Sequence, residues 1–244
     1  MTDDVLAIDK QARAWTFTLN RPDKRNALSG ELVEALIAAV DEAHARQVPL
    51  LVFRGAGKNF SAGFDFTGYE DQSDGDLLLR MVRIETLLQQ VAGSPSLTVA
   101  LAHGRNFGAG VDLFAACKLR YCTAGASFRM PGLKFGLVLG TRRFRNIVGT
   151  GRALSILGSA RTFDAREAEH MGFVMQAAEE AEWPGLLRQA ADTATMLDAP
   201  TRAALYGALD ANAADADMAA LACSAARPGL KTRIRQYLDD QARG

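Results

Sequence analysis

Short apolar segments that alternate with amphipathic ones constrain the fold of this chain more than any other feature of its sequence. Residues 50–53 and 97–102 are two such apolar runs, and their length and composition suit strands that are covered on both faces. Between them, residues 76–91 carry apolar side chains at helical spacing. Repetition of strand and helix in this order predicts an α/β fold with a parallel sheet.

The segments on either side extend this pattern. β-favouring residues alternate at 5–8 and at 15–19, which predicts an opening hairpin. Ser29 is a candidate N-cap for a helix that ends near Gln47, and Asp164 is a candidate N-cap for a helix followed by a last strand from Phe173. Three further elements are expected in the middle of the chain: a helix over 111–118 and strands over 119–122 and 127–128.

The last part of the chain is expected to be entirely helical. Beyond about Glu182 the apolar residues recur at helical spacing, and Pro200 and Pro228 separate the helical segments. We therefore divide the chain into an α/β core over residues 1–187 and a helical C-terminal region over residues 188–244.

Charge, cysteine content and missing motifs exclude several functional classes. The 28 Lys and Arg balance the 28 Asp and Glu, so the chain has no basic field for nucleic acid or an anionic membrane. Its three cysteines form no CxxC pair, which excludes a disulfide framework and gives no zinc site. No GxGxxG or GxxxxGK[ST] nucleotide motif occurs. Without a signal segment or a run of about 18 apolar residues, a cytoplasmic protein that does not enter a membrane is expected.

Two glycine-bearing junctions follow predicted strands and are the first candidates for a functional site. They are Ser61-Ala62-Gly63-Phe64-Asp65 and Gly104-Arg105-Asn106-Phe107-Gly108-Ala109-Gly110. Glycine lets a ligand approach the backbone closely, and the second junction opens a helix whose first amides lack intrahelical acceptors. If the junctions lie on neighbouring strands, one N–H from each would meet at a single carbonyl oxygen, as in an oxyanion hole. Two ordinary tight turns explain the same glycines equally well.

Further segments occur in a fixed order around these junctions. They are Leu19-Asn20-Arg21-Pro22, Asn26-Ala27-Leu28, residues 60–65, residues 104–117, Ser127-Phe128 with Pro131, Gly140-Thr141-Arg142-Arg143, and residues 164–168 running on to Gly172-Phe173-Val174. Each segment is common alone, whereas the order and intervals are specific. Over almost its whole length the chain resembles the enoyl-CoA hydratase/isomerase family, the crotonase superfamily.

This resemblance implies a spiral of ββα turns with a helical C-terminal region, assembled as a homotrimer or as a hexamer built from two trimers. Family members bind acyl-CoA thioesters, as in fatty-acid metabolism, and stabilise a thioester enolate or oxyanion with two backbone amides. Matched by position, these amides belong to Phe64 and Ala109. No metal is implied, and no cofactor beyond the coenzyme A that forms part of the substrate.

The resemblance also assigns substrate-binding residues. Lys24 and Arg25 are expected near the CoA phosphates and the Ala62 backbone near the adenine, although a solvated charged turn is the alternative. Tyr237, with Lys231, is expected to reach the CoA pocket of a neighbouring subunit, and packing between subunits is the alternative. The other positions matched to the substrate pocket are Ala27, Gly63, Phe64, Gly108 and Gly132.

The chain departs from the family where the two catalytic glutamates are expected. The first glutamate falls on Asp112, which keeps the carboxyl group but is shorter by one methylene, about 1.5 Å. The second falls on Gly132, which has no side chain. Hydration of a double bond needs two acid/base groups, so a standard two-glutamate hydratase is disfavoured. Asp112 is then the best candidate for proton transfer.

Asp112 lies in the first turn of a predicted helix, which leaves two interpretations open. The helix dipole would hold the carboxylate ionised and favour a catalytic base, or the side chain only caps free amides.

Two further candidates lie elsewhere in the chain. Arg129 is a candidate partner for a carboxylate on the acyl chain, and a surface salt bridge is the alternative. The acidic loop of Glu70, Asp71 and Asp74 is a candidate cover for the acyl group, and a solvated loop is the alternative.

The function expected from these residues is that of an acyl-CoA-processing enzyme closer to an isomerase, hydrolase or lyase than to a standard hydratase. The three histidines are not expected to supply a second acid/base group. The alternative is a catalytically inactive acyl-CoA-binding protein that retained the fold. Loss of the second glutamate is the main support for that alternative.

Overall fold

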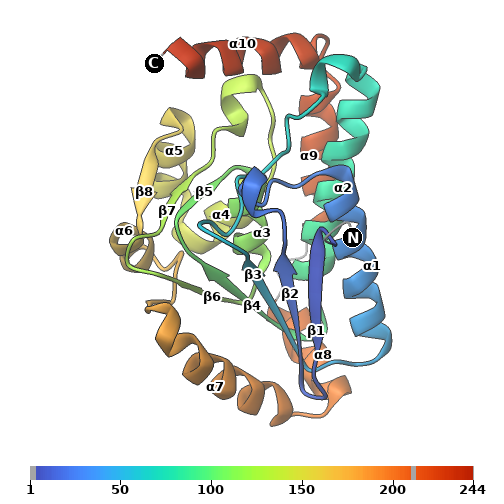
Figure 1. Cartoon of the computed structure of the whole chain (residues 1–244), viewed down its shortest axis with the longest axis vertical. Helices are drawn as coiled ribbons and strands as arrows, with labels where there is room; N and C mark the ends of the chain where they lie inside the picture. Colours follow the sequence, from blue (N-terminus) through green and yellow to red (C-terminus); the bar gives the residue numbers. More distant parts are fainter. Residues whose placement is uncertain (1–3, 210–212, 244) are drawn as a thin grey trace.

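The computed structural model describes residues 4–209 and 213–243. The chain folds into two mixed β-sheets surrounded by helices (Figure 1). The larger sheet has the strand order β1-β2-β3-β4-β6-β9, and the smaller has the order β5-β7-β8. The strands span Leu6–Lys10 (β1), Ala14–Leu19 (β2), Leu50–Gly55 (β3), Leu97–Ala102 (β4), Arg105–Phe107 (β5), Leu119–Cys122 (β6), Ser127–Arg129 (β7), Thr162–Asp164 (β8) and Gln176–Ala177 (β9).

The larger sheet follows the predicted pattern. β1 and β2 form the antiparallel hairpin, and every other pair of neighbouring strands in this sheet is parallel. The central strand β4 is buried along its whole length, which explains its continuous apolar sequence. From β4 onward the chain enters the larger sheet, then the smaller sheet, then a helix, and this confirms the predicted ββα spiral.

Two helices, Gly30–Ala45 and Ala165–His170, begin at the predicted caps. The Ser29 hydroxyl accepts a hydrogen bond from the Leu32 amide at 3.2 Å, and the Asp164 carboxylate accepts one from the Glu167 amide at 2.8 Å. The helices span Gly30–Ala45 (α1), Asp74–Ala92 (α2), Ala109–Ala116 (α3), Thr141–Val148 (α4), Thr150–Ser159 (α5), Ala165–His170 (α6), Trp183–Thr195 (α7), Ala199–Leu209 (α8), Ala214–Ala225 (α9) and Leu230–Arg243 (α10).

The predicted start of the last strand is wrong. The strand β9 begins at Gln176, because the amides of Phe173 and Val174 both donate to the Ala168 carbonyl and close the turn after α6. Helices α4 and α5 lie where no element is predicted. The division of the chain after residue 187 stays a prediction, and α7 runs continuously through that point.

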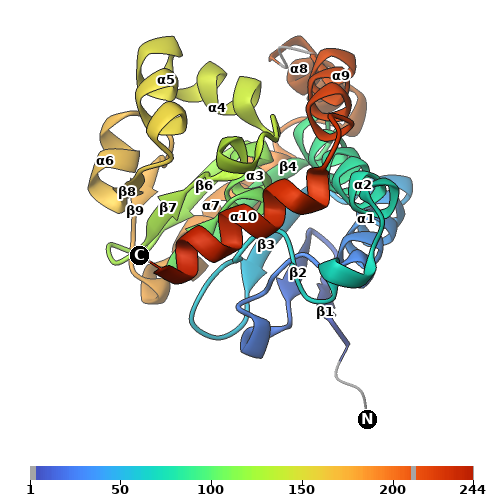
Figure 2. The same cartoon turned by 90° about the horizontal axis from the view of Figure 1, so that it is seen from above.

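The C-terminal helices lie at two opposite ends of the molecule. Figure 1 shows α7 and α8 at one end of the larger sheet and α10 across the other end, while α9 lies beside α2. Seen from above in Figure 2, α10 crosses over the end of the core. Within the described ranges, no helix has the length and apolar character needed to cross a membrane.

A cluster of phenylalanines joins the smaller sheet to α3 and α4. Five rings from α3, β7, α4, β8 and the turn after α6 are fully buried, with neighbouring centroids 5.3–5.8 Å apart. They belong to Phe114, Phe128, Phe144, Phe163 and Phe173. This cluster fixes the position of α3 relative to the smaller sheet. It therefore also positions the candidate site residues that α3 carries.

Replacement of Phe128 with alanine should remove the centre of this cluster. We expect the free energy of unfolding of Phe128→Ala to fall by about 3–5 kcal/mol, because the cavity left behind closes only in part. Urea-induced unfolding followed by circular dichroism measures this loss. Leu154→Ala is the control, since Leu154 is 74% exposed and its change should be about 0.5 kcal/mol or less. Equal losses in both variants would contradict the role given to the cluster.

Candidate active site

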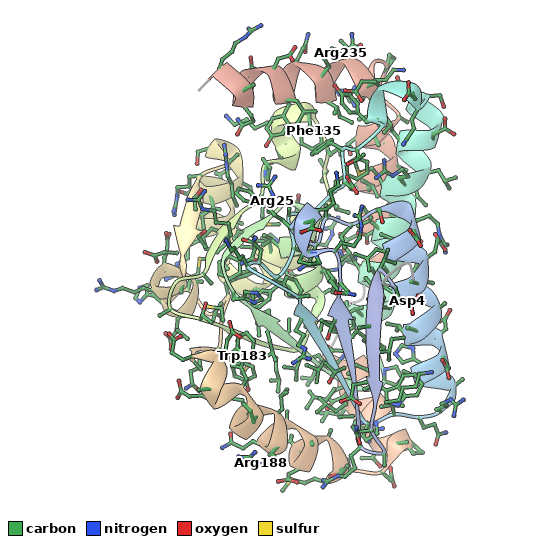
Figure 3. The ribbon with its side chains drawn as sticks, in the orientation of Figure 1. Asp4, Arg25, Phe135, Trp183, Arg188 and Arg235 are labelled. Carbon is green, nitrogen blue, oxygen red and sulfur yellow. The ribbon has the colours of Figure 1, made fainter. Side chains whose placement is uncertain are left out.

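A cavity of about 710 Å³ lies between the two glycine junctions and α10. Its lining from the first part of the chain includes the predicted residues Lys24, Arg25, Ala27, Ala62 and Phe64. From the later part it includes Gly108, Ala109, Asp112, Gly132 and Tyr237. In Figure 3, Arg25 and Phe135, another lining residue, both lie between the central strands and α10. The structure therefore gathers residues far apart in the sequence around one cavity.

The two junctions contact each other through their backbones. The Phe107 amide donates to the Ser61 carbonyl at 3.1 Å. Gly63 adopts a φ of +80°, and a Cβ atom there would lie 2.3 Å from the Phe107 carbonyl oxygen and 3.0 Å from the Ala109 nitrogen. Only glycine is compatible with both the conformation and the space. Gly63 itself does not line the cavity, so its contribution to substrate binding is through this packing.

The amides of Phe64 and Ala109 are both available to a ligand. Ala109 is the first residue of α3, after Gly108 with a φ of 47°, so its N–H has no intrahelical acceptor. Within the described part of the chain, neither amide donates to a protein acceptor. Both residues line the cavity. Their convergence on one oxygen atom stays a prediction.

Asp112 is buried at the inner end of the same cavity. Its side chain is 3% exposed, and its Oδ1 atom has no hydrogen-bond partner among the described residues. A Cβ atom at Gly140 would lie 1.8 Å from that Oδ1, so the carboxyl group packs directly against the Gly140 backbone. Gly140 therefore provides the space that the Asp112 side chain occupies.

Both interpretations of Asp112 from the helix position are wrong. Its side chain makes no capping hydrogen bond at the start of α3. Burial raises the pKa of Asp112 well above its usual range, while Arg143 lowers the pKa and Glu85 raises it further. Loss of water around the carboxylate therefore favours its protonated form, opposite to the effect expected from the helix dipole. A raised pKa favours a proton donor over the predicted base.

A buried ion pair acts electrostatically on Asp112. Neither of its two residues is part of the predicted site. Glu85 of α2 is 1% exposed and pairs with both terminal nitrogens of Arg143 in α4. Asp217 of α9 lies 3.7 Å from the same guanidinium group. The sequence carried a signal for this pair, because Glu85 is an acidic residue on the apolar stripe of α2, between Ile84 and Leu88.

A second ion pair supports the first junction. Asp65 accepts a hydrogen bond from Arg21 at 2.7 Å and another from the Thr67 amide at 2.9 Å. Arg80 of α2 donates to the Asp65 carbonyl at 2.6 Å and places its guanidinium 4.2 Å from the Phe64 ring centroid. These contacts hold the Phe64 side chain and the backbone that follows it.

Two other predicted candidates, Arg129 and Asp74, have structural contacts, and so does His103, which is not expected to act as an acid or a base. Arg129 lies outside the cavity and donates to the Ala160 carbonyl at 2.8 Å. His103 also lies outside the cavity, and its Nε2 atom is 2.8 Å from the Gly57 carbonyl. Asp74 does not line the cavity. It accepts hydrogen bonds at 2.8–3.1 Å from the first amides of α10 and the residue before it.

Tyr237 lines the cavity of its own chain rather than reaching only a neighbouring one. Its ring centroid lies 5.0 Å from that of Phe135, and Arg233 of the same helix donates to the Phe135 carbonyl at 3.0 Å. Lys231 does not line the cavity and donates to the Glu70 carbonyl at 3.0 Å. Helix α10 therefore closes one side of the cavity. Among the described residues, no group of His, Cys, Asp and Glu is arranged to hold a metal ion.

Comparisons with known proteins agree with this fold. Residues 9–236 match the family model described as enoyl-CoA hydratase/isomerase. A Bacillus subtilis (strain 168) protein named "Probable enoyl-CoA hydratase" is 32% identical over 185 residues, covering 72% of this chain and 70% of that protein.

Solved structures show the same architecture. The crystal structure of a Bordetella parapertussis enoyl-CoA hydratase/isomerase family protein is 72% identical, with a TM-score of 0.95 and coverage of 96% of this chain and 98% of that one. An enoyl-CoA hydratase from Bacillus halodurans shares the fold at 21% identity, with a TM-score of 0.83 and coverage of 95% and 99%. The fold and its cavity thus define the crotonase class of α/β proteins. Within it, the chain belongs to the enoyl-CoA hydratase/isomerase family of enzymes.

The raised pKa of Asp112 predicts a pH-dependent effect of Asp112→Asn on stability. The folded wild type keeps a proton that the unfolded chain loses near its unperturbed pKa of 3.8, so wild-type stability falls as the pH rises from there toward the folded pKa. The slope reaches at most about 1.4 kcal/mol per pH unit. The Asn variant lacks this loss, so its stability relative to the wild type should increase with pH.

Urea unfolding of both proteins at several pH values between about 5 and 8 measures this difference. Asp71→Asn, at an exposed position, is the control and should give a curve parallel to the wild type. A parallel curve for Asp112→Asn as well would show that the Asp112 carboxyl ionises as easily in the folded protein as in the unfolded chain.

Proposed function

We propose that this chain is an enzyme that acts on an acyl-CoA thioester and stabilises a thioester enolate or oxyanion with the amides of Phe64 and Ala109. The observation that carries this proposal is the pair of amides without protein acceptors on the lining of one cavity. A negative oxygen would gain two hydrogen bonds there, one of them at the positive end of α3.

The cavity lining supports a thioester with an uncharged acyl group. Lys24 and Arg25 supply positive charge for the CoA phosphates. Elsewhere the lining is mostly apolar and includes Met81, Leu139 and Leu157. Arg129, the candidate partner for an acyl carboxylate, lies outside this cavity. We therefore propose an acyl chain without a carboxylate.

We propose that Asp112 is the proton donor of the reaction. Burial raises its pKa and favours the neutral form, which has a proton to give to the carbon or leaving group that becomes negative during the reaction. Gly132, which the resemblance matches to the second family glutamate, lines the same cavity and has no carboxyl group. One acid and two amides suit an isomerase, a hydrolase or a lyase better than a hydratase that uses two glutamates.

An acyl-CoA-binding protein without catalytic activity is the alternative, favoured by the missing second carboxyl group. Incubation of the purified protein with a panel of acyl-CoA esters separates the two functions. Calorimetry measures binding and mass spectrometry measures products. The proposed enzyme converts at least one ester, whereas tight binding without conversion of any ester would support the alternative.

We also propose that the chain assembles as a homotrimer or a hexamer. Large apolar side chains on and beside α7 and α8 are exposed in the isolated chain, which supports contacts between subunits there. They belong to Met196, Leu197, Leu205 and Leu209. Analytical ultracentrifugation of the purified protein distinguishes these assemblies from a monomer.

Ala109→Pro tests the oxyanion site, because proline removes the amide hydrogen but is tolerated at the first position of a helix. We expect kcat on the converted ester to fall by about 100- to 1000-fold. Ala109→Gly keeps the amide and is the matched control, with kcat close to that of the wild type. Steady-state kinetics measure both variants, and circular dichroism checks their fold. Unchanged turnover by a folded Ala109→Pro variant would exclude this amide from the mechanism.

Lys24→Gln with Arg25→Gln tests the proposed contacts to CoA phosphates. Loss of two charges should raise KM by about tenfold or more at low salt and leave kcat nearly unchanged, because the phosphates are remote from the reacting carbons. Added salt should reduce the difference from the wild type. Arg188→Gln is the control, since Arg188 is exposed on α7 at the opposite end of the molecule (Figure 3). The same KM in all three proteins would place the phosphates elsewhere.

A further inference from the structure

Glu85 is a buried carboxylate that the proposed reaction does not use. It lies on α2, is 1% exposed and does not line the cavity. Its two oxygens accept hydrogen bonds from both terminal nitrogens of Arg143, one of them at 3.1 Å, and Gln89 donates to it at 3.0 Å. Both terminal nitrogens of the Arg143 guanidinium group are therefore bound to Glu85.

The acidic groups that form ion pairs with Arg143 do not include Asp112. Asp217 lies 3.7 Å from Arg143 and is bonded to Arg142 at 2.9 Å. These two arginines thus face two acidic residues, Glu85 and Asp217. Across the described residues, no ion pair or hydrogen bond links Arg143 to Asp112. Asp112 is left without a positive partner in contact, although Arg143 is close enough to act on it electrostatically.

The other surroundings of Asp112 supply no further charge. Its helix α3 packs against α2, α4, β4 and β5. From α2 and α4 the charged groups that face it are Glu85 and Arg143. The strand β4 has no titratable residue, and Arg105 of β5 is exposed. The protonation of Asp112 therefore depends on its burial and on how these two side chains share their charges.

We propose that Glu85 is a positioning residue for Asp112: by binding both terminal nitrogens of Arg143, it withholds that cation from Asp112 and keeps the Asp112 carboxyl group neutral and able to donate a proton. The negative charge of Glu85 adds to the same effect. Without Glu85, Arg143 would keep Asp217, 3.7 Å away, as its acidic partner, and its positive charge would act on the unpartnered Oδ1 of Asp112 with less opposition.

The meaning of this arrangement for catalysis rests on the proposed function, but the charge state of Asp112 is measured without any substrate. Protein labelled with ¹³C at the aspartate carboxyl carbons is titrated by NMR, and Asp112→Asn identifies the signal of Asp112. In Glu85→Gln we expect the titration midpoint of Asp112 to fall by about 1–3 pH units.

Matched variants separate this effect from general damage. Glu34→Gln breaks another two-bonded Glu–Arg pair, with Arg83, between α1 and α2, and should leave the Asp112 midpoint unchanged. Glu85→Gln with Arg143→Gln removes both opposing charges, so the midpoint should return to the wild-type value or above. If Glu85 had only a structural role, the Asp112 midpoint would shift in this double variant by at least as much as in Glu85→Gln.

Asp217→Asn is the second test if Glu85→Gln does not fold, because Asp217 is a weaker competitor for Arg143 outside the core. It should lower the Asp112 midpoint in the same direction by a smaller amount. An unchanged or raised midpoint in the folded variants would overturn the proposal. With a converted ester in hand, the basic limb of the kcat profile should move to lower pH in Glu85→Gln by the same shift.

Discussion

The backbone contact between the two glycine junctions is the constraint on which the rest of the site depends. Gly63 lies so close to Phe107 and Ala109 that no side chain fits between them. This contact brings a loop that follows β3 against the start of α3, and the phenylalanine cluster holds α3 from its other side. The free amides of Phe64 and Ala109 are thus fixed by rigid neighbours and not by the ligand, which is the condition for preorganised stabilisation of charge.

Burial determines the chemistry available within this frame. At Asp112, removal of water raises the pKa and favours the acid form of a residue that the helix position marks as a base. The cation that acts on Asp112, Arg143, is paired with Glu85. Two charged groups outside the cavity therefore influence a group inside it. Fold, packing and protonation state are connected through α2, α3 and α4.

Much of the fold was predictable because its signals are local. The hairpin, the buried strand β4 and the caps at Ser29 and Asp164 follow from alternation, apolar runs and capping side chains. The cavity residues were assigned through the resemblance. The three-residue strands β5 and β8 are too short to show a period, and the charge state of Asp112 depends on residues 27 and 31 positions away in the sequence. Such long-range pairings leave no pattern in a single sequence.

The hydrogen bonds between Asp74 and the start of α10 connect one wall of the cavity to α2. One carboxylate holds the start of that helix through three backbone amides, while Tyr237 on the same helix forms part of the cavity lining. Among the described residues of α10, Leu230 and Ile234 are buried, and Tyr237 and Leu238 pack partly buried against the core. Because Asp74 is the first residue of α2, the helix that supplies Glu85 also anchors one wall of the cavity. A change at the start of α2 would therefore disturb both the cavity lining and the surroundings of Asp112.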